Sequence, residues 1–186
     1  EEIGKDEEHN AVIKERRNGQ GAEVAGVTVE GKVAYLSLVQ LQAGVTWQKS
    51  HYTRPEKWSK DSSVPAEKRI FRTPDWYGYF TATYSPVKPL NIALSGTYTG
   101  SMIVQHMKGY IPKDIAVTTP DFFDMNLKIS YDFSLYKFIT LQLNAGIQNI
   151  FNAYQRDFDQ GKERDSGYIY GPSMPRSYFA GAKLMF

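Results

Sequence analysis

The stretch from Phe123 to Phe133 reads FDMNLKISYDF, and it decides the fold because apolar and polar side chains alternate along its whole length. Successive side chains of an extended strand point to opposite faces, so every second residue from Phe123 lies on one apolar face. The polar face carries Asp124, Asn126, Lys128, Ser130 and Asp132. A helix, with about 3.6 residues per turn, cannot separate these two sets. The stretch predicts a β-strand with two unlike faces.

Six further segments show the same alternation, and together they predict an all-β, antiparallel protein of about seven strands. They span residues 27–35, 41–47, 76–84, 90–99, 139–148 and 178–186. Only the last segment breaks the pattern clearly, because Phe179 and Met185 fall on its polar side.

The connections between these segments alternate in length. Short ones fall near Leu36–Leu38, Ser85–Pro89 and Ser134–Lys137. Long polar ones fall near Ser50–Arg72, His106–Pro120 and Gln155–Ser173, with Glu1–Gly21 as another. Bacterial outer-membrane barrels have short turns on the periplasmic side and long loops outside. The sequence therefore predicts a segment of an antiparallel transmembrane β-barrel.

The composition narrows the possible classes further. With a formal net charge of +2 over 186 residues, no nucleic-acid partner is expected, and the lack of cysteine excludes disulfides and thiolate metal sites. No stretch reaches the roughly 20 apolar residues of a transmembrane helix. The mean hydropathy of −0.46 is typical of soluble proteins. Alternating barrel strands give the same value, however, because their polar and apolar residues cancel.

Aromatic residues lie near both ends of the expected apolar face. The pairs are Trp76 with Tyr84, Phe123 with Tyr131 or Phe133, and Tyr178 with Phe186. Eight strand residues of about 3.3 Å, tilted by about 40°, rise roughly 20 Å, which approaches the apolar band of about 25 Å in such barrels. Aromatic rings favour the two bilayer interfaces, so this spacing indicates two aromatic girdles.

An odd number of strands is a difficulty for a complete barrel, because bacterial single-chain barrels have even numbers. Either a further strand lies within Glu1–Gly21, or the strands belong to a larger barrel. The density of charge in Glu1–Arg17 favours the larger barrel.

Three features near the carboxy end resemble the closing strands of TonB-dependent receptors. Asn149-Ile150-Phe151-Asn152 resembles the family's Asn-containing box, with Tyr154 following slightly closer than is common. Pro175-Arg176 resembles the Pro-Arg pair that leads into the last strand. The alternation that ends at Phe186 resembles the signal read by the outer-membrane assembly machinery.

The resemblance implies that residues 1–186 form the C-terminal part of a plugged barrel of about 22 strands. It implies import of a siderophore, haem, cobalamin or oligosaccharide across the bacterial outer membrane. The partners would be outer-membrane lipid, the receptor's own plug and remaining strands, TonB, and the assembly machinery at Phe186. We recognise no plug and no TonB box, and the amino-terminal EEIGKDEEHN is not a signal peptide, so we expect part of a longer receptor. No enzyme activity and no cofactor are expected.

Seven aromatic residues are candidates for ligand contact. Tyr77 and Tyr79 are expected on the polar, lumenal face, where packing against the plug is the alternative. The loop candidates are Tyr52, Trp58, Tyr110, Tyr168 and Tyr170. Aromatic side chains make good anchors in binding sites. The lumenal charges are expected to pair with one another or with the plug, because a buried charge needs a partner. These charges are Glu30, Lys32, Asp124, Lys128, Asp132 and Lys183.

No metal or catalytic site is predicted. His51 and His106 fall near the outer rim, where separated histidines are usually solvated. Asp157-x-Asp159-x-Gly161 begins like a calcium loop but lacks the later bidentate acid. Phe71-Arg72-Thr73-Pro74 resembles the FRAP box of haem receptors without the motif that follows it. No nucleophile elbow or phosphate loop is found.

Two other readings remain open. A complete eight-stranded outer-membrane enzyme, of acyltransferase or protease type, would need a hidden eighth strand and His, Ser or Asp side chains converging at the rim. A soluble lipocalin-like binding barrel would turn its apolar side chains inward, so dependence on lipid or detergent distinguishes it.

Overall fold

The computed structural model describes residues 2–6, 11–14, 19 and 21–186, and in this part of the chain all regular structure is strand. The long strands are β3 (Ala22–Tyr35), β4 (Val39–Glu56), β6 (Trp76–Val87), β7 (Leu90–Thr99), β10 (Phe122–Tyr136), β11 (Ile139–Gln148) and β12 (Ser177–Met185). The short strands are β1 (Glu2–Asp6), β2 (Ala11–Lys14), β5 (Glu67–Arg69), β8 (Ile103–His106) and β9 (Ile115–Thr118). The described residues hold no helix that could cross a membrane.

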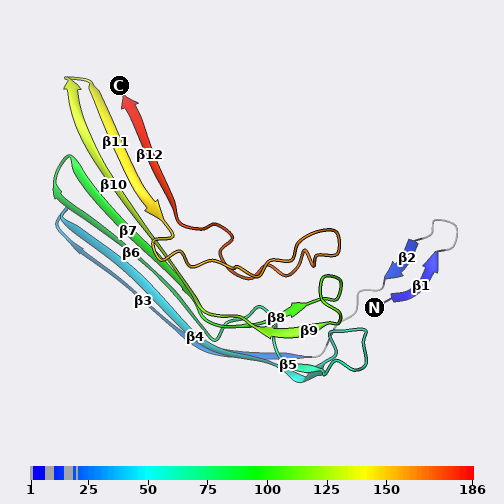
Figure 1. Ribbon diagram of the computed structural model, residues 1–186. Helices are drawn as coiled ribbons and strands as arrows, with labels where there is room; N and C mark the ends of the chain where they lie inside the picture. The colour runs from blue at the N-terminus through cyan, green and yellow to red at the C-terminus, as the bar shows by residue number, and fades with distance from the viewer. Residues whose placement is uncertain (1, 7–10, 15–18, 20) are drawn as a thin grey trace.

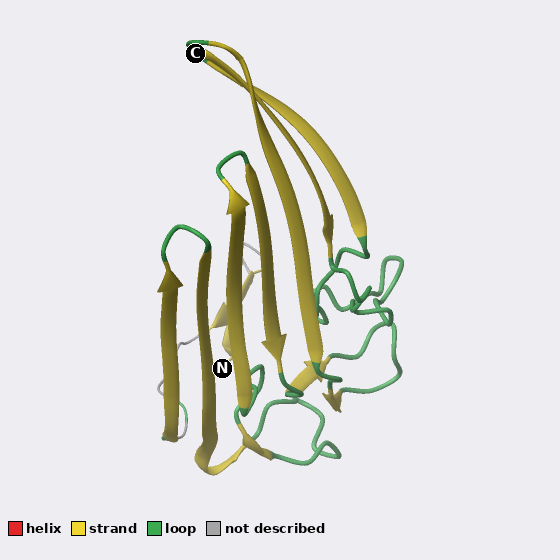
Figure 2. Ribbon diagram, turned by 90° about the vertical axis from the view of Figure 1, so that its left-hand side faces the viewer, coloured by secondary structure: helices red, strands yellow, loops and turns green. Residues whose placement is uncertain are grey.

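The seven long strands form one antiparallel sheet in the order β12-β11-β10-β7-β6-β4-β3, with β5 added beside β4. Each long strand therefore pairs with the long strands before and after it in sequence, as in an up-and-down barrel. These are the seven strands that the alternation predicts, so the all-β antiparallel class is confirmed. The sheet is a single curved layer with one concave face (Figures 1 and 2).

The register places the apolar residues of all seven strands on the same face. One row crosses the whole sheet through Val33, Leu41, Ala82, Leu94, Leu127, Ile147 and Tyr178. The neighbouring row on the opposite face contains Lys32, Gln42, Thr81, Ser95 and Asn126. A slip of one residue at any pair would turn a strand's apolar set to the polar face, so these rows show a consistent register.

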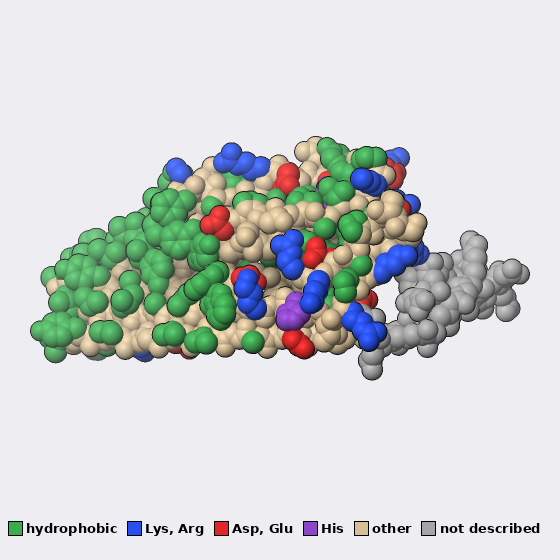
Figure 3. Space-filling model, turned by 90° about the horizontal axis from the view of Figure 1, so that it is seen from below, with side chains coloured by type: hydrophobic (Ala, Val, Ile, Leu, Met, Phe, Trp, Pro, Cys, Tyr) green, Lys and Arg blue, Asp and Glu red, His purple; other side chains and the backbone are tan. Residues whose placement is uncertain are grey.

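The sheet itself has almost no core. The buried apolar residues lie toward the end with the long loops, and they are Val64, Ile103, Val104, Phe122 and Tyr168. On the sheet, large side chains stay open to solvent, with 63% of Val29 and 65% of Val33 exposed. Seen from below, hydrophobic side chains cover much of the convex face (Figure 3). A lipocalin would turn this face inward, so the structure contradicts that reading.

Aromatic rings are present near both ends of the convex face, as the sequence predicts. Toward the long loops, the ring centroids of Trp47 and Trp76 lie 6.4 Å apart. Toward the short turns, the centroids of Tyr131 and Phe133 lie 4.6 Å apart. That these rings meet the bilayer interfaces stays a prediction.

Phe179 interrupts the alternation of β12 because its ring covers a glycine on the neighbouring strand β11. Gly146 is its register partner, and a Cβ atom placed on Gly146 would come within 2.5 Å of the Phe179 ring. Tyr79 lies over Gly44 in the same way, with 2.7 Å to such a Cβ atom. On the polar face, these two glycines have no side chain and so leave room for the aromatic rings.

The amino-terminal segment adds no strand to the main sheet. β1 and β2 pair with each other, and Figure 1 shows them apart from the long strands. The eighth strand considered for Glu1–Gly21 is therefore not found among the described residues of that segment, and His9 lies outside them. β3 and β12 form the two edges of the sheet and are not paired with each other.

The three short connections are turns, as predicted, and the three long ones are long loops. The long loops also contain β5, β8 and β9, which alternation did not predict because three or four residues are too few to show a period. β4 continues to Glu56, well beyond the apolar band that ends near Trp47.

Candidate functional site

The three long loops, residues 57–75, 100–121 and 149–176, lie at the same end of the sheet (Figures 1 and 2). Chain direction explains this arrangement, because alternate connections of an antiparallel sheet must fall at the same end. The loops carry most of the aromatic candidates and nearly all of the buried residues. This end is therefore the candidate functional site.

A group of five polar and aromatic side chains joins loops 100–121 and 149–176. We call it the loop cluster, and it consists of His106, Asp157, Asp159, Tyr168 and Tyr170. Nε2 of His106 lies 3.0 and 2.9 Å from the two carboxylate oxygens of Asp159. The His106 ring stacks on Tyr168, with centroids 3.7 Å apart and planes at 7°. Asp157 accepts hydrogen bonds from the hydroxyls of Tyr168, at 2.8 Å, and Tyr170, at 2.6 Å.

Loop 57–75 is attached to the other two loops by separate contacts. The guanidinium of Arg72 donates to the carbonyl oxygens of Ile169, at 2.8 Å, and Gly167. The hydroxyl of Ser59 donates to Asp114 at 2.5 Å, and Asp114 also accepts the backbone N–H of Lys108. These hydrogen bonds lower the pKa of Asp114. All three loops therefore form one packed structure.

The loop cluster shifts the pKa values of its own members. Burial raises the pKa of Asp157, but hydrogen bonds from Tyr170 and Tyr168 outweigh burial and lower it overall. Burial and the contact with Asp157 raise the pKa of Tyr170 to about 12, and the same causes raise the pKa of Tyr168. Both hydroxyls therefore remain protonated donors in the folded loops well into alkaline solution.

The loop cluster is expected to loosen at both pH extremes. The tyrosines have raised pKa values, so their contribution is complete below about pH 10 and lost as pH rises through the folded values, near 12 for Tyr170. Asp157 has a lowered pKa, so its contribution is present above its ordinary value of 3.8 and lost as pH falls through the lower folded value. Tyrosinate absorbance and protease cleavage of loop 149–176 measure these transitions. Tyr170→Phe should remove a late-titrating group, and an unchanged late step in that variant would contradict the assignment.

The Asn box, residues 149–152, is a tight turn at the end of β11. Asn149 and Asn152 have φ values of 51° and 54°, the left-handed region that asparagine tolerates better than most residues. Asn149 is only 4% exposed. Its Oδ1 accepts the N–H of Ala153, and its Nδ2 donates to the carbonyl oxygens of Ala153 and Met174. Asparagine thus satisfies both the backbone geometry and the buried hydrogen bonds.

The Asn box also holds the chain that enters the last strand. Oδ1 of Asn152 accepts the N–H of Arg176 at 2.9 Å, and Nδ2 of Asn149 donates to Met174 at 3.0 Å. The two sequence motifs, which lie about 25 residues apart, are therefore bonded to each other. Ile150 donates its N–H to Met125, and the Phe151 ring stacks on Phe123 at 5.7 Å. The motif fixes how the last three strands meet the loops.

The structure separates the seven aromatic candidates into accessible and packed residues. Tyr110 is 56% exposed on loop 100–121, and Tyr77 and Tyr79 are open on the polar face of β6. Tyr52, on the extension of β4, is half-buried. Trp58 is also half-buried, donates from Nε1 to Pro65, and packs edge-on against Phe71.

Tyr168 and Tyr170 belong to the loop cluster described above, and Tyr168 is 3% exposed. The structure brings these two together, with ring centroids 5.3 Å apart, but does not gather all seven candidates at one point.

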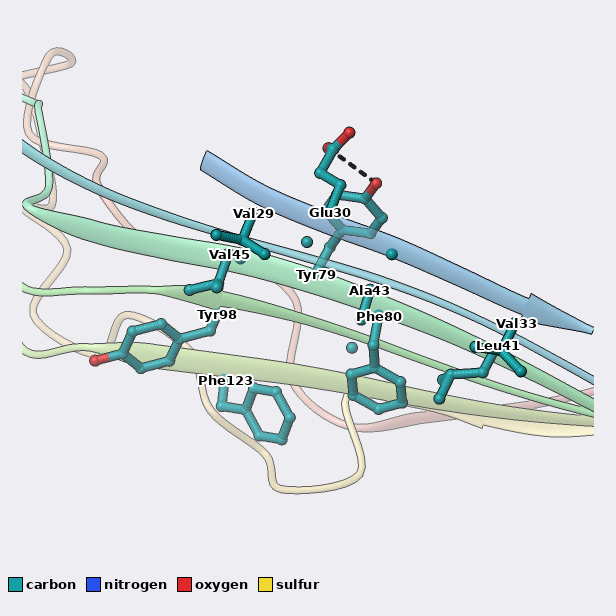
Figure 4. Close-up of a pocket in the computed structure, with 14 residues that line it drawn as sticks. Val29, Glu30, Val33, Leu41, Ala43, Val45, Tyr79, Phe80, Tyr98 and Phe123 are labelled. Atoms are coloured by element: carbon teal, nitrogen blue, oxygen red, sulfur yellow. Dashed lines mark hydrogen bonds between the residues drawn. The ribbon is translucent and has the colours of Figure 1, made fainter. Parts of the chain in front are cut away.

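The polar face holds Glu30 and Tyr79, which project together to one side of the sheet (Figure 4). The Tyr79 hydroxyl donates to Glu30 at 3.1 Å and lies 3.2 Å from Nε2 of Gln42, which donates to it. On the other side, Leu41, Phe80 and Phe123 help line an apolar hollow of about 570 Å³ (Figure 4).

Pairing of the polar-face charges with one another is not found within the described part of the chain, and their pairing with the plug stays a prediction. The six charged residues form no ion pair with one another there. Asp132 instead accepts a hydrogen bond from Gln142, and Glu30 accepts from Tyr79. Asp132 and Glu30 have neutral partners because the aligned rows place polar but mostly uncharged residues beside them.

The expectation that His106 is solvated is also wrong, because Tyr168 and Asp159 enclose it. His51 lies on β4, and its Nε2 atom is 3.3 Å from a carboxylate oxygen of Glu23. The described residues contain no group of three or more His, Cys, Asp or Glu placed to hold a metal. Asp157 and Asp159 serve the loop cluster instead of a calcium site.

Sequence reasoning did not identify Arg72, Ser59, Asp114 or Gln155 as structural residues of the loops. Gln155 is 1% exposed, donating to Tyr168 and accepting from Tyr170. The resemblance of residues 71–74 to a receptor box marked Arg72 without giving its role. For Ser59, Asp114 and Gln155, no local pattern in the sequence indicated a structural role.

Solved outer-membrane receptors contain a similar sheet. The ferric-catecholate import receptor Fiu from E. coli K12 matches 88% of this chain with a TM-score of 0.60 and 21% identity, over 21% of its own length. The ferripyoverdine receptor of the Pseudomonas aeruginosa outer membrane, bound to ferripyoverdine, matches 88% at a TM-score of 0.59 and 15% identity, over 19% of its length. The chain has the fold of a TonB-dependent receptor barrel segment.

A third match, from a complex of FpvAI with pyocin S2, also covers 88% of this chain and 19% of the other, with a TM-score of 0.59 and 15% identity. The chain thus spans about a fifth of the length of these solved receptors. No protein-family model and no curated protein matches the sequence. At these identities the similarity shows the fold alone.

Proposed function

We propose that this chain forms part of the wall and the outer loops of a TonB-dependent receptor that imports a scarce ligand across the bacterial outer membrane. The observation that carries the proposal is the register, which aligns apolar residues over seven strands on a bare convex face. Burying such a face gains about 25 cal/mol per Å² of apolar surface. Bilayer lipid supplies that burial without a second protein layer.

We propose the remaining partners on the support of the same geometry. Unpaired backbone groups in lipid cost several kcal/mol each. We therefore propose that further strands of the same barrel pair with the edge strands β3 and β12. The polar concave face suits a lumen that holds the receptor's plug, through which TonB acts. Phe186 is 89% exposed, which leaves it free for the assembly machinery.

The ligand is proposed to be a ferric siderophore, and the loop end of the sheet is proposed to meet it first. The ligands of two structural neighbours, ferric catecholate and ferripyoverdine, favour this class over haem, cobalamin and oligosaccharide. Among the aromatic candidates, Tyr52, Trp58, Tyr77, Tyr79 and Tyr110 are proposed as contact residues. Tyr168 and Tyr170 are proposed to act indirectly, by holding the loops in place.

Cell fractionation followed by blotting tests the assignment as a receptor wall. We expect the native polypeptide in the outer-membrane fraction, at several times the 21.2 kDa of this chain. A band at that mass whose mobility shifts on boiling would indicate a small self-closed barrel and favour the enzyme alternative. A soluble protein would contradict both membrane readings.

Tyr110→Ala is expected to weaken binding of an iron-loaded catecholate siderophore by about 5- to 30-fold, which is the usual effect of losing an aromatic anchor. Tyr136→Ala is the matched control, because Tyr136 is 72% exposed but lies at the opposite, short-turn end of the sheet. Binding is measured with the native receptor in detergent. Equal losses in the two variants would remove Tyr110 from the proposed contact surface.

A further inference from the structure

A polar pocket of about 370 Å³ lies at the loop end of β10 and β11, beside the Asn box. Its walls come from the strand ends and from the segment that enters β12. The lining residues are Asp124, Asn126, Gln148, Asn149, Pro172, Ser173, Met174, Pro175 and Ser177. Asp124, Asn126 and Gln148 come from polar positions of the strands, so the pocket opens on the side away from the apolar rows.

Asp124 is the anomaly in this pocket. Its Oδ1 atom is buried and has no hydrogen-bond partner among the described residues. Its carboxylate also takes part in no ion pair there. Asp124 as a whole is half-buried, but even one buried carboxylate oxygen without a partner is costly, and proteins rarely keep one without a compensating contact.

Comparison with Asp132 shows that position on this face does not explain the missing partner. Asp132 lies on the same strand and the same face, and it accepts a hydrogen bond from Gln142 at 2.7 Å. In the pocket, two neighbours of Asp124 form bonds with other groups. The side-chain oxygen of Asn126 accepts from the N–H of Asn149, and that of Gln148 accepts from Ser177.

The nine lining residues include no lysine, arginine or histidine, so the negative charge of Asp124 is not balanced inside the pocket. We propose that this pocket binds a cationic organic group, a guanidinium or a primary ammonium, against Asp124. A guanidinium fits a carboxylate through two parallel hydrogen bonds, which also sets its orientation. A hard metal ion fits less well, because calcium takes six to eight oxygen ligands, usually from several carboxylates.

The inference rests on the proposed function, because a receptor lumen places polypeptide or ligand against this face of the sheet. Two sources can supply the same chemistry. One is a lysine or arginine side chain of a polypeptide segment that lies against the concave face. The other is a cationic group on the imported ligand.

The test uses the native protein in detergent, with L-argininamide as the cationic probe and L-citrullinamide as its neutral counterpart. The thermal midpoint and the probe affinity are measured for the unmodified protein, Asp124→Asn and Asp132→Asn. Asp132→Asn is the matched control, because it removes a carboxylate that already has a protein partner. Charge-assisted hydrogen bonds of this kind correspond to roughly 10- to 100-fold in affinity.

If an imported ligand supplies the cation, argininamide raises the midpoint of the unmodified protein and of Asp132→Asn. Citrullinamide does not, and Asp124→Asn weakens the argininamide response at least about tenfold. If a polypeptide side chain fills the pocket, argininamide has no effect, and Asp124→Asn lowers the midpoint more than Asp132→Asn does.

The proposal is overturned if argininamide has no effect on the unmodified protein and Asp124→Asn is as stable as it or more stable. That result would mean that the carboxylate has no cationic partner. Should Asp124→Asn fail to fold, carbodiimide coupling of the unmodified protein to added glycine ethyl ester decides, because a carboxylate that is paired with a cation is protected from coupling. Slower coupling at Asp124 than at Asp132 supports a cationic polypeptide side chain in the pocket, and equally fast coupling together with no argininamide response contradicts the proposal. None of these measurements depends on transport, so they can contradict the proposed cation site without contradicting the receptor assignment.

Discussion

Asn149→Ala is expected to destabilise the loop end of the sheet by about 4 kcal/mol. Three part-buried hydrogen bonds of the side chain, to the N–H and C=O of Ala153 and the C=O of Met174, disappear at about 1 kcal/mol each. Alanine also tolerates the φ of 51° less well than asparagine, which adds about 1 kcal/mol. The Asn149 side chain itself is only 4% exposed, so its removal also leaves a space beside these backbone groups.

Amide hydrogen exchange at residues 149–153 and 174–176, together with denaturant unfolding of the native protein, measures this loss. Asn149→Gly separates the two causes, because glycine keeps the backbone conformation but lacks the side chain. It should recover about 1 kcal/mol. Asn144→Ala is the matched control on the same strand, since the Asn144 side chain makes no hydrogen bond with the described residues. Equal effects at the two asparagines would show that the Asn box has no special role.

The strands of the sheet were predictable because their signal is local. In the stretch from Phe123 to Phe133, each residue indicates its own face, and the same holds for the other six long strands. Pairing in sequence order then follows from short turns such as Leu36–Leu38. Phe179 shows the limit of this reasoning, because its position depends on a glycine of the neighbouring strand.

The loop end was not predictable in the same way, because its contacts join residues far apart in the chain. His106 and Asp159 are 53 positions apart, and Arg72 reaches a carbonyl 95 positions away. No period or spacing reports such pairs, so His106 looked like a surface residue in the sequence. The Asn box was recognised as a motif, but its hydrogen bonds to the segment entering β12 explain why asparagine is needed.

Leu94→Arg is expected to destabilise the folded protein in a bilayer by about 2–4 kcal/mol, the cost of arginine on the lipid face of a barrel near the membrane midplane. Leu94 belongs to the apolar row between Ala82 and Leu127. It lies midway along β7 between Tyr98 and Leu90, whose register partners Phe123 and Tyr131 mark the two aromatic ends. Arginine there has the longest path to either interface.

Ser95→Arg is the control that makes this test specific to one face. Ser95 is the next residue of β7, and it lies in the polar row with Thr81 and Asn126, so its arginine points away from the apolar side. The folded fraction in lipid vesicles, followed by the mobility shift on boiling, should fall strongly for Leu94→Arg and much less for Ser95→Arg. If the two variants lose the same amount, the convex face does not meet lipid, and the sheet is not a membrane wall. If Ser95→Arg loses more, the polar face is the one that excludes water, and the convex face does not meet lipid.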